Sequence, residues 1–425
     1  MTRSIPLAGA LCLLFVCGLA GAQGDGSALP TIPVQSLGTE ATTPARFERL
    51  RLTASNTLNE ISLQGYVQLD NDFYDGAYNQ RGNGGSSENE IRRARFGVEG
   101  TLEGGWSYDF LLNVDDDEQT ADVDTASIRY AGEPWAAITA GRFKRPVGLE
   151  VLTSAKWSLT DERAIIFEAI PHNDVSQFGL MLDGALSGFH YYLGIFDANV
   201  EDIQTGEDQY GLYARLTYAD VSQRGNVLHL GLSAADQKPD DRTPTTVASR
   251  FGVHTLPSDR YQFVNELNPN RTRASVIEVN KDRQAGVEFA TVLGPVTIQA
   301  EVLGRDLALS AGRNVQVRGG YLAVAWALTG QRRRYNADNG TFGNILGAGD
   351  AKRSAWELVA KVDHVEARKD ADAKVTLGTL GLIWTPNLNL RFLVDYLRFK
   401  SDGLADGDDF QDEGSAVNAR MQFHF

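Results

Sequence analysis

Basic side chains stand two residues apart at several places in the sequence, among them Arg93-x-Arg95 and Arg142-x-Lys144. In extended backbone, residues two apart project from the same face, so each pair would place two positive groups side by side. Closely spaced guanidinium and ammonium groups can replace the water that an anion loses in a narrow passage with charge-assisted hydrogen bonds. These residues therefore suggest weak, reversible anion binding. An alternative of equal weight is that they pair with carboxylates on neighbouring elements.

Motifs for enzymatic or metal chemistry do not occur in the sequence. It has no His-Glu-x-x-His, no Gly-x-Ser-x-Gly and no Walker loop. Its 6 histidines stand far apart, and its 2 cysteines, Cys12 and Cys17, both lie close to the N-terminus. We therefore expect no enzyme, no cofactor and no metal site.

Composition excludes two further classes of protein. The 425 residues are 42% hydrophobic, and no internal stretch of about 20 residues lacks a charge, which excludes a polytopic helical transporter. The formal net charge of −15 argues against nucleic acid as a partner, because phosphate binding needs a basic face. Gly 43, Tyr 14 and Phe 19 beside Met 3 are typical of a β protein.

The N-terminus has the order of charges and apolar residues that is typical of a secretory signal peptide. Arg3 is followed by the apolar run from Ile5 to Ala20 and by Ala20-Gly21-Ala22. An uncleaved membrane anchor is the alternative, but the run is short for one. We predict a signal peptide over 1–22, an N-terminal arm over 23–58 that is rich in Gly, Pro, Ser and Thr, and a folded domain over 59–425.

From Ile61 onwards the hydrophobic pattern has a period of two, which predicts β-strands. About sixteen segments of about ten residues share it, the length with which a tilted strand crosses a bilayer. By this alternation, one face of the sheet carries the following charged residues: Arg93, Arg95, Arg129, Arg142, Lys144, Arg215, Arg305, Arg391 and Arg420, with Glu99, Asp109, Asp183, Glu301, Glu357, Asp363 and Asp395.

Connections between the predicted strands alternate in length. Short turns lie at 103–105, 132–134, 187–188, 294–295 and 386–387, whereas the intervening connections are mostly longer and polar. This asymmetry is typical of an outer-membrane barrel. The connection at about 330–352 breaks it, and is either a missed strand pair or a long periplasmic loop. We predict an all-β, transmembrane antiparallel β-barrel of about 16 strands, with a soluble β-sandwich or propeller as the alternative.

Residues 141–163 contain a strand ending in Gly-Arg-Phe-Lys, then Leu149-Glu150, Thr-Ser-Ala-Lys and Glu162-Arg163. This stretch resembles the phosphate-selective porin O and P family, and 91–95, 124–128, 192–196 and 355–358 are similar to other family blocks. The resemblance runs from about residue 60 to Phe425. It implies a sixteen-stranded channel, usually a trimer, whose third loop folds into the pore and narrows it.

The resemblance also implies roles for single residues. Arg93 matches an arginine of the family's anion-guiding ladder, with Arg92 beside it, and Asp124 matches an aspartate of the constriction. A constriction lysine of the third loop falls on Val151 here, and a first-strand arginine falls on Tyr66. Later constriction lysines align loosely near one further residue, Arg318.

Two more basic residues, Lys156 and Arg163, lie in the segment that the resemblance identifies as the inward loop. We expect them at the narrowest part of the pore, unless they brace the loop to the barrel wall through Glu162. With Arg92, Arg93, Arg95, Asp124, Arg142, Lys144 and Arg318 they complete the predicted ion path.

We therefore expect a passive porin of the bacterial outer membrane that admits small hydrophilic solutes and prefers anions such as phosphate or polyphosphate. Its expected partners are outer-membrane lipid, lipopolysaccharide, small anions and two further copies of the chain in a homotrimer. A weakly selective general porin is the nearest alternative. A surface adhesin, or a barrel enzyme with a plugged lumen, is the alternative from another class.

Overall fold

The computed structural model describes residues 51–53, 60–79, 87–115, 120–133, 135–169, 176–197, 210–223, 225–238, 244–245, 247–256, 261–263, 277–309, 312, 314–347, 353–369, 372–404 and 413–425. The chain divides into two compact units, Met1–Arg46 and Phe47–Phe425, and all described residues belong to the second. The predicted signal peptide and most of the predicted arm lie outside the described residues, and their boundaries stay predictions.

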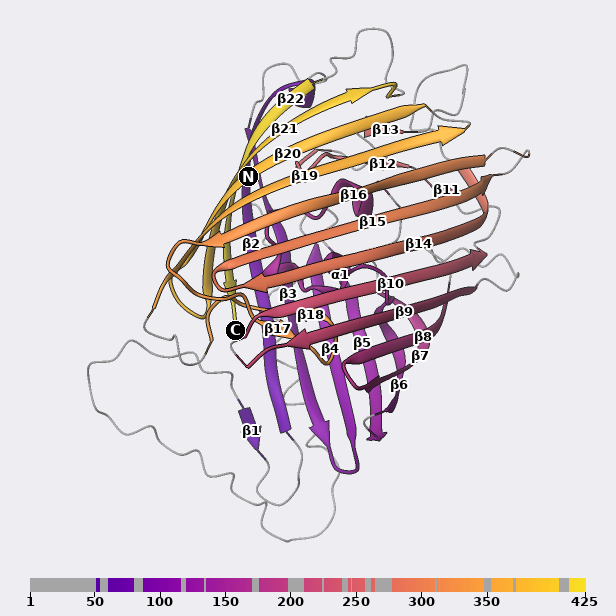
Figure 1. Ribbon diagram of the computed structural model, residues 1–425, viewed down its shortest axis with the longest axis vertical. Helices are drawn as coiled ribbons and strands as arrows, with labels where there is room; N and C mark the ends of the chain where they lie inside the picture. The colour runs from indigo at the N-terminus through magenta and orange to yellow at the C-terminus, as the bar shows by residue number, and fades with distance from the viewer. Residues whose placement is uncertain are drawn as a thin grey trace, which may run out of the picture. The chain divides into compact units, whose positions relative to one another are not determined.

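Sixteen antiparallel strands form the wall of the second unit (Figure 1). They are β2 (Glu60–Gly76), β3 (Ser87–Leu102), β4 (Trp106–Asp115), β5 (Thr120–Glu133), β6 (Ala136–Lys144), β7 (Ser176–Leu186), β8 (Phe189–Asp197), β9 (Tyr210–Val221), β10 (Val227–Lys238), β14 (Ile277–Leu293), β15 (Val296–Leu309), β16 (Asn314–Ala327), β19 (Ala355–Lys369), β20 (Ala373–Thr385), β21 (Leu390–Asp402) and β22 (Glu413–His424).

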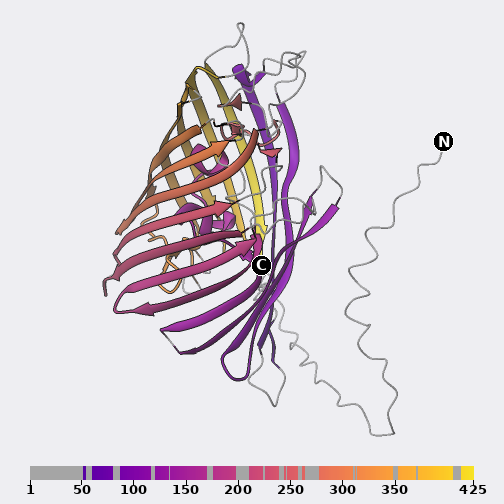
Figure 2. The same cartoon turned by 90° about the vertical axis from the view of Figure 1, so that its right-hand side faces the viewer.

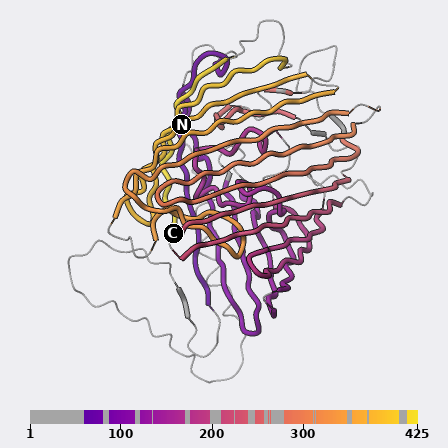
Figure 3. The backbone as a smooth tube through the Cα atoms, in the orientation of Figure 1, coloured from indigo at the N-terminus to yellow at the C-terminus, as the bar shows by residue number. Residues whose placement is uncertain are grey.

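The wall closes on itself, because β22 pairs with β2 at the start of the barrel. Val67 lies opposite Phe423, and Phe73 lies opposite Val417. Every other neighbouring pair consists of strands that follow each other in the chain, as the colours in Figures 2 and 3 show. Closure leaves no exposed sheet edge. The predicted barrel of about 16 strands is thus confirmed.

The two faces of the wall differ in the way that the period of two predicts. In β10, Leu228, Leu230 and Leu232 are between 38% and 57% exposed, whereas His229 and Ser233 on the other face are at most 7% exposed. Because adjacent side chains in a strand point to opposite faces, this alternation turns the leucines outward and the polar residues into the barrel.

Turns at one end of the barrel are short, as expected. Ser187 (φ 52°) and Gly188 (φ 83°) connect β7 to β8, and both lie in the left-handed region that the tight reversal requires. The exception is the connection between β16 and β19, where β17 (Tyr335–Asn336) and β18 (Thr341–Phe342) form a small hairpin of their own. The expected irregularity at 330–352 is therefore a strand pair outside the barrel wall.

Short elements accompany the wall. β1 (Arg51–Thr53) extends the sheet beside β2, β11 (Pro244–Thr245) pairs with β14, and β12 (Ala248–Ser249) pairs with β13 (Tyr261–Gln262). The helical turns are η2 (Ala77–Asn79), α1 (Leu149–Leu152), η3 (Ala155–Trp157) and α2 (Ile165–Glu168). None of the described helices is long and apolar enough to cross a membrane.

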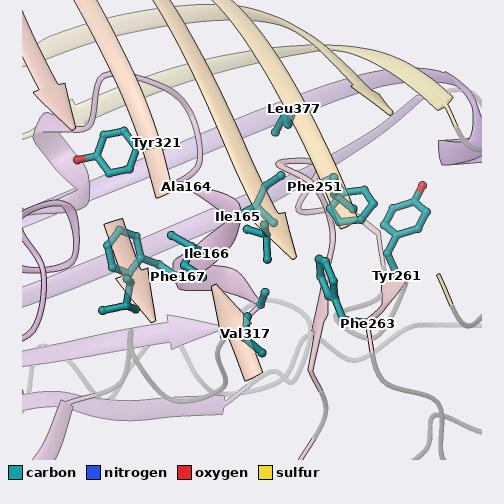
Figure 4. Close-up of a cluster of buried hydrophobic side chains, with 14 of the residues drawn as sticks. Ala164, Ile165, Ile166, Phe167, Phe251, Tyr261, Phe263, Val317, Tyr321 and Leu377 are labelled. Carbon is teal, nitrogen blue, oxygen red and sulfur yellow. The ribbon is translucent and has the colours of Figure 1, made fainter. Parts of the chain in front are cut away.

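Apolar side chains from the connections pack against the buried face of the wall. Figure 4 shows Ile165, Ile166 and Phe167 of α2 beside Val317 and Tyr321 of β16. A second aromatic group stands nearby, in which the rings of Phe251 and Tyr261 stack with centroids 4.2 Å apart (Figure 4). These contacts hold residues 145–169, 247–256 and 261–263 by hydrophobic burial.

Candidate functional site

Residues 145–169, here called the β6–β7 segment, are hydrogen-bonded to carboxylates on the buried face of distant strands. The backbone N–H groups of Leu149 and Glu150 donate to the two oxygens of Glu301 on β15, at 2.7 Å each. The N–H of Asp161 donates to Asp395 Oδ2 on β21, also at 2.7 Å. Carboxylates thus satisfy backbone donors that a loop buried in this way could not pair with water.

Two cations of the wall also bind this segment. Lys361 of β19 lies 3.0 Å from Glu150 Oε1, and both side chains are almost fully buried. The Arg391 guanidinium of β21 donates to the carbonyls of Lys156, at 3.0 Å, and Ser158, at 2.5 Å. Ion pairs and charge-assisted hydrogen bonds along residues 149–161 therefore position a segment that has few helical residues.

A β-bulge between β2 and β3 brings two consecutive arginines to the same side of the wall. Gln68 pairs with Arg93 and Leu69 pairs with Ile91, so Arg92 is the additional residue. Without a bulge, neighbours in a strand point to opposite faces. Here Arg92 and Arg93 both reach Glu162 of the β6–β7 segment, at 2.8 Å and 3.4 Å.

Glu162 is the centre of this arginine cluster. Arg420 of β22 approaches it at 2.8 Å and also pairs with Asp70 of β2 at 2.5 Å. Burial by itself raises the pKa of Glu162, but the guanidinium groups of Arg92, Arg93 and Arg420 outweigh it and hold the pKa well below its ordinary value. Glu162 is therefore ionised at neutral pH and ties the segment to β3 and β22.

A second bulge places Asp124 beside Arg95. Leu111 pairs with Thr125 and Leu112 with Val123, so that Asp124 is the additional residue of β5. Asp124 Oδ1 lies 3.0 Å from the Arg95 guanidinium. Both side chains are partly exposed, at 13% and 19%, which leaves them accessible from the barrel interior.

Lys156 lies among aromatic rings. Its ammonium group is 5.6 Å from the ring centroid of Tyr66 and 5.8 Å from that of Trp157. Such positions over a ring face attract a cation. Tyr66, which stands where the resemblance expects an arginine, thus contacts a lysine of the β6–β7 segment.

Two other predicted cations, Arg163 of the segment and Lys144 of β6, contact the backbone of the β6–β7 segment. Arg163 donates to the carbonyls of Glu150 and Val151, at 3.1 Å and 3.4 Å, and Lys144 donates to the carbonyl of Val151 at 2.8 Å. The Val151 side chain is 1% exposed, so it does not present a group to solvent. Arg142 lies opposite Ala126 in β5, with its Nε buried and no hydrogen-bond partner among the described atoms.

The connection between β16 and β19 meets the β6–β7 segment. Arg333 pairs with Glu357 at 2.8 Å and donates to the carbonyl of Trp157, also at 2.8 Å. The N–H of Phe342 donates to Thr153 Oγ1 at 3.3 Å. The sequence did not predict this contact between the two connections. The signal that pointed to it was the connection at about 330–352, which breaks the alternation of short and long connections.

Three neighbouring hollows lie among the described residues, two of them against the buried face of β2–β8. One of ≈ 460 Å³ has Glu99, Asp109 and Arg129 in its wall. The next, of ≈ 350 Å³, shares Arg129 and lies between Lys144 and the β17–β18 hairpin. The third, of ≈ 750 Å³, separates that hairpin from Ser154 and Trp157. Shared lining residues make the three hollows neighbours.

A comparison with protein families matches residues 61–425 of this chain to the phosphate-selective porins O and P. The chain belongs to that porin family. Porin O of Pseudomonas aeruginosa is 26% identical over 403 residues, which cover 88% of this chain and 91% of that protein. An uncharacterized protein of Caulobacter vibrioides is 27% identical over 356 residues, covering 79% of this chain and 68% of that protein.

Solved porin structures resemble the fold of this porin. The anion-selective porin from Comamonas acidovorans is 13% identical with a TM-score of 0.55, over 86% of this chain and 100% of that one. OmpT of Vibrio cholerae is 10% identical with a TM-score of 0.54, over 88% and 100%. Family and relatives identify an outer-membrane porin channel, located in the bacterial outer membrane.

Two predicted pore residues of the porin, Arg318 and Arg142, lie on the outward-facing side of the wall. Arg318 of β16 is exposed, opposite Glu366 of β19, and it shares its face with the outward-pointing Leu322 and Trp326. The expectation that Arg318 lines the ion path is therefore corrected: its strand parity turns it away from the interior. Arg142 of β6 is corrected in the same way: it pairs with Ala126 and with the outward-pointing Phe178, because its neighbour Phe143 takes the buried position. Other charged residues that were assigned inward by parity, such as Arg215 and Asp363, are buried on the inner face.

No three of the described His, Cys, Asp or Glu residues of this porin form a group that could hold a metal ion. Instead, buried carboxylates meet arginines. Arg215 pairs with Glu288 at 2.6 Å, and Arg129 pairs with Asp183. Pairing across the interior, which the sequence left open beside ion guidance, thus accounts for many of these charges.

Proposed function

We propose that this porin is a passive channel for small hydrophilic solutes with a preference for anions, phosphate or polyphosphate among them. The observation that carries the channel is the closed barrel with an apolar outer face and polar hollows along the inner face of β2–β8. Water and hydrated solutes pass only where polar groups replace the lipid environment. The preference for anions is supported by the family and by the name of its relative Porin O.

The β6–β7 segment is, in this proposal, the third loop folded into the pore, and it narrows the passage from one side. Its contacts with Glu301, Asp395 and Arg391 on the buried face support this position. The β17–β18 hairpin, which contacts the segment through Phe342, narrows the passage further along.

The proposed ion path runs past Lys156 and Arg95. Lys156 is held near Tyr66 by its aromatic contacts, and the central carbon of the Arg95 guanidinium lies 5.9 Å from the centroid of the same Tyr66 ring. An anion that enters between them would find two cations, with Asp124 limiting how tightly it binds. Arg92, Arg93 and Lys144 support the positive potential, whereas Arg163 braces the loop backbone.

A weakly selective porin is the second candidate, and specific contacts favour it. Arg95 is paired with Asp124, and Arg129 with Asp183, so part of the positive charge is already neutralised. Val151, which replaces a constriction lysine of the family, adds no charge at all. Selectivity measurements distinguish this candidate from the first.

The experiment compares reversal potentials in planar bilayers under a potassium chloride gradient. Neutralising the path with Lys156→Gln and Arg95→Gln should shift the reversal potential away from anion preference. The matched control is Lys374→Gln, because Lys374 is an exposed strand-end lysine paired with Asp402 at 2.8 Å. An unchanged reversal potential in the double variant supports the weakly selective porin.

We further propose a homotrimer that is embedded in lipid and lipopolysaccharide. The trimer is supported by the trimer form of OmpT of Vibrio cholerae, which is 11% identical with a TM-score of 0.52. Outward residues such as Leu232 and Trp326 supply an apolar surface for lipid contact. Native mass spectrometry of the purified protein tests the stoichiometry, and N-terminal sequencing tests for cleavage of the predicted signal peptide after Ala22.

A further inference from the structure

Two buried carboxylates of the porin have no cationic partner among the described side chains. Asp161 of the β6–β7 segment is 4% exposed, and Asp395 of β21 is 1% exposed. Both carboxylate oxygens of Asp161, and Oδ1 of Asp395, accept no hydrogen bond from any described group. The nearby Arg420 donates to the backbone carbonyl of Asp161 and pairs with Asp70 and Glu162 instead. Buried negative charge without compensation is strongly unfavourable.

An amide oxygen joins these carboxylates. Asn418 of β22 is 3% exposed and lies directly opposite Asp395 in the sheet. Its Nδ2 donates to the carbonyl of Gly252 at 2.7 Å, which fixes the orientation of the amide. The other end of that amide, Oδ1, is therefore an acceptor, and it too has no partner among the described atoms.

These three side chains line one small cavity of ≈ 10 Å³, the room that one water molecule or one bare metal ion occupies. Two cations also line the cavity: Lys361 is engaged by Glu150 at 3.0 Å, and Arg163 donates to the carbonyls of Glu150 and Val151. A methyl group at Gly381 would lie 2.4 Å from Asp395 Oδ1, so glycine leaves the space that this carboxylate takes. A water molecule could donate only two hydrogens to four unpaired oxygens and would leave the charge in place.

We propose that Asp161, Asp395 and Asn418 bind one Ca²⁺ ion, which fastens the β6–β7 segment to β21 and β22. A divalent cation balances the two carboxylates. Hard oxygen donors without nitrogen or sulfur favour Ca²⁺ over transition metals, and Ca²⁺ accepts irregular, partly bidentate coordination more readily than Mg²⁺ does. This site does not depend on the proposed ion selectivity, because it lies between the segment and the wall.

The test measures calcium in the full-length porin, purified in detergent, stripped with EDTA, incubated with Ca²⁺ and desalted. Elemental analysis should find one Ca²⁺ per wild-type chain and none in Asp161→Asn with Asp395→Asn. Asp109→Asn is the matched control, because Asp109 is an inner-face carboxylate that accepts a hydrogen bond from Gln64 at 2.6 Å and should retain the ion. The unfolding temperature should rise with Ca²⁺ in wild type and in the control, but not in the double variant.

Two results would overturn the site. The first is wild-type protein that binds no Ca²⁺ and has an unfolding temperature insensitive to EDTA. The negative charge of Asp161 and Asp395 would then be reduced by a proton that the two carboxylates share. Equal calcium content in wild type and double variant would assign the ions to surface carboxylates. Because asparagine retains the shape of aspartate, the double variant is expected to fold. If the double variant does not fold, the calcium content of the wild-type protein still tests whether the site binds Ca²⁺.

Discussion

Replacing Glu162 by glutamine should release the β6–β7 segment from the wall. The carboxylate meets Arg92 at 2.8 Å, Arg93 at 3.4 Å and Arg420 at 2.8 Å, and its side chain is 13% exposed. Glutamine would remove this carboxylate from Arg92 and Arg93, while Arg420 would keep its pair with Asp70. Removing one partner of a buried ion pair costs about 3–5 kcal/mol, and partial exposure favours the lower end, about 3 kcal/mol. Because about 1.4 kcal/mol corresponds to a factor of ten, the open segment should become about a hundred times more populated.

Hydrogen exchange of the segment's backbone amides measures this opening. Peptides that cover residues 159–169 should exchange about two orders of magnitude faster in Glu162→Gln than in wild type, while peptides from β20 should not change. The control is Glu413→Gln, since Glu413 forms a surface ion pair with Arg398 at 3.2 Å and is 62% exposed, so that little stability depends on it. Equal exchange in wild type and Glu162→Gln would refute the anchoring role of Glu162.

Two further predictions concern pH and backbone packing. Burial raises the pKa of Glu168 above its ordinary 4.5. The protonated carboxyl therefore stabilises the folded protein fully below pH 4.5, and this stabilisation is lost as the pH rises through the raised pKa. Glu168→Gln should therefore flatten the pH dependence of the unfolding temperature in that window, and an unchanged slope would count against it. A Cβ at Gly97 would lie 2.0 Å from the Phe110 carbonyl, whereas one at Gly304 meets nothing within 4 Å. Gly97→Ala should lower the free energy of unfolding in urea by about 1–3 kcal/mol, and Gly304→Ala should leave it nearly unchanged; equal effects would contradict the packing argument.

Strand alternation made the barrel predictable from sequence. A period of two follows directly from backbone geometry, so it assigned faces correctly for residues as far apart as Arg93 and Arg420. It would also have assigned Arg318 outward, with Leu322 and Trp326; the expectation of a pore role came from a loose alignment instead.

The bulges could not be predicted in this way. They place Arg92 and Asp124 in the site, but each arises from the register between two paired strands, which no single strand's sequence specifies. The β17–β18 hairpin could not be predicted from the sequence for a related reason. Strands of two residues carry no periodic signal, and its position depends on tertiary contacts of Arg333 and Phe342.

Conductance is the most direct test of the central claim that this chain is an anion-preferring porin. Purified full-length protein, added to a planar lipid bilayer under a potassium chloride gradient, should produce discrete conductance steps. The sign of its reversal potential should indicate chloride as the more permeant ion, and phosphate added to one side should reduce the chloride current by competing for the same path. Absence of steps would contradict the channel, and a reversal potential of the opposite sign would contradict the preference for anions.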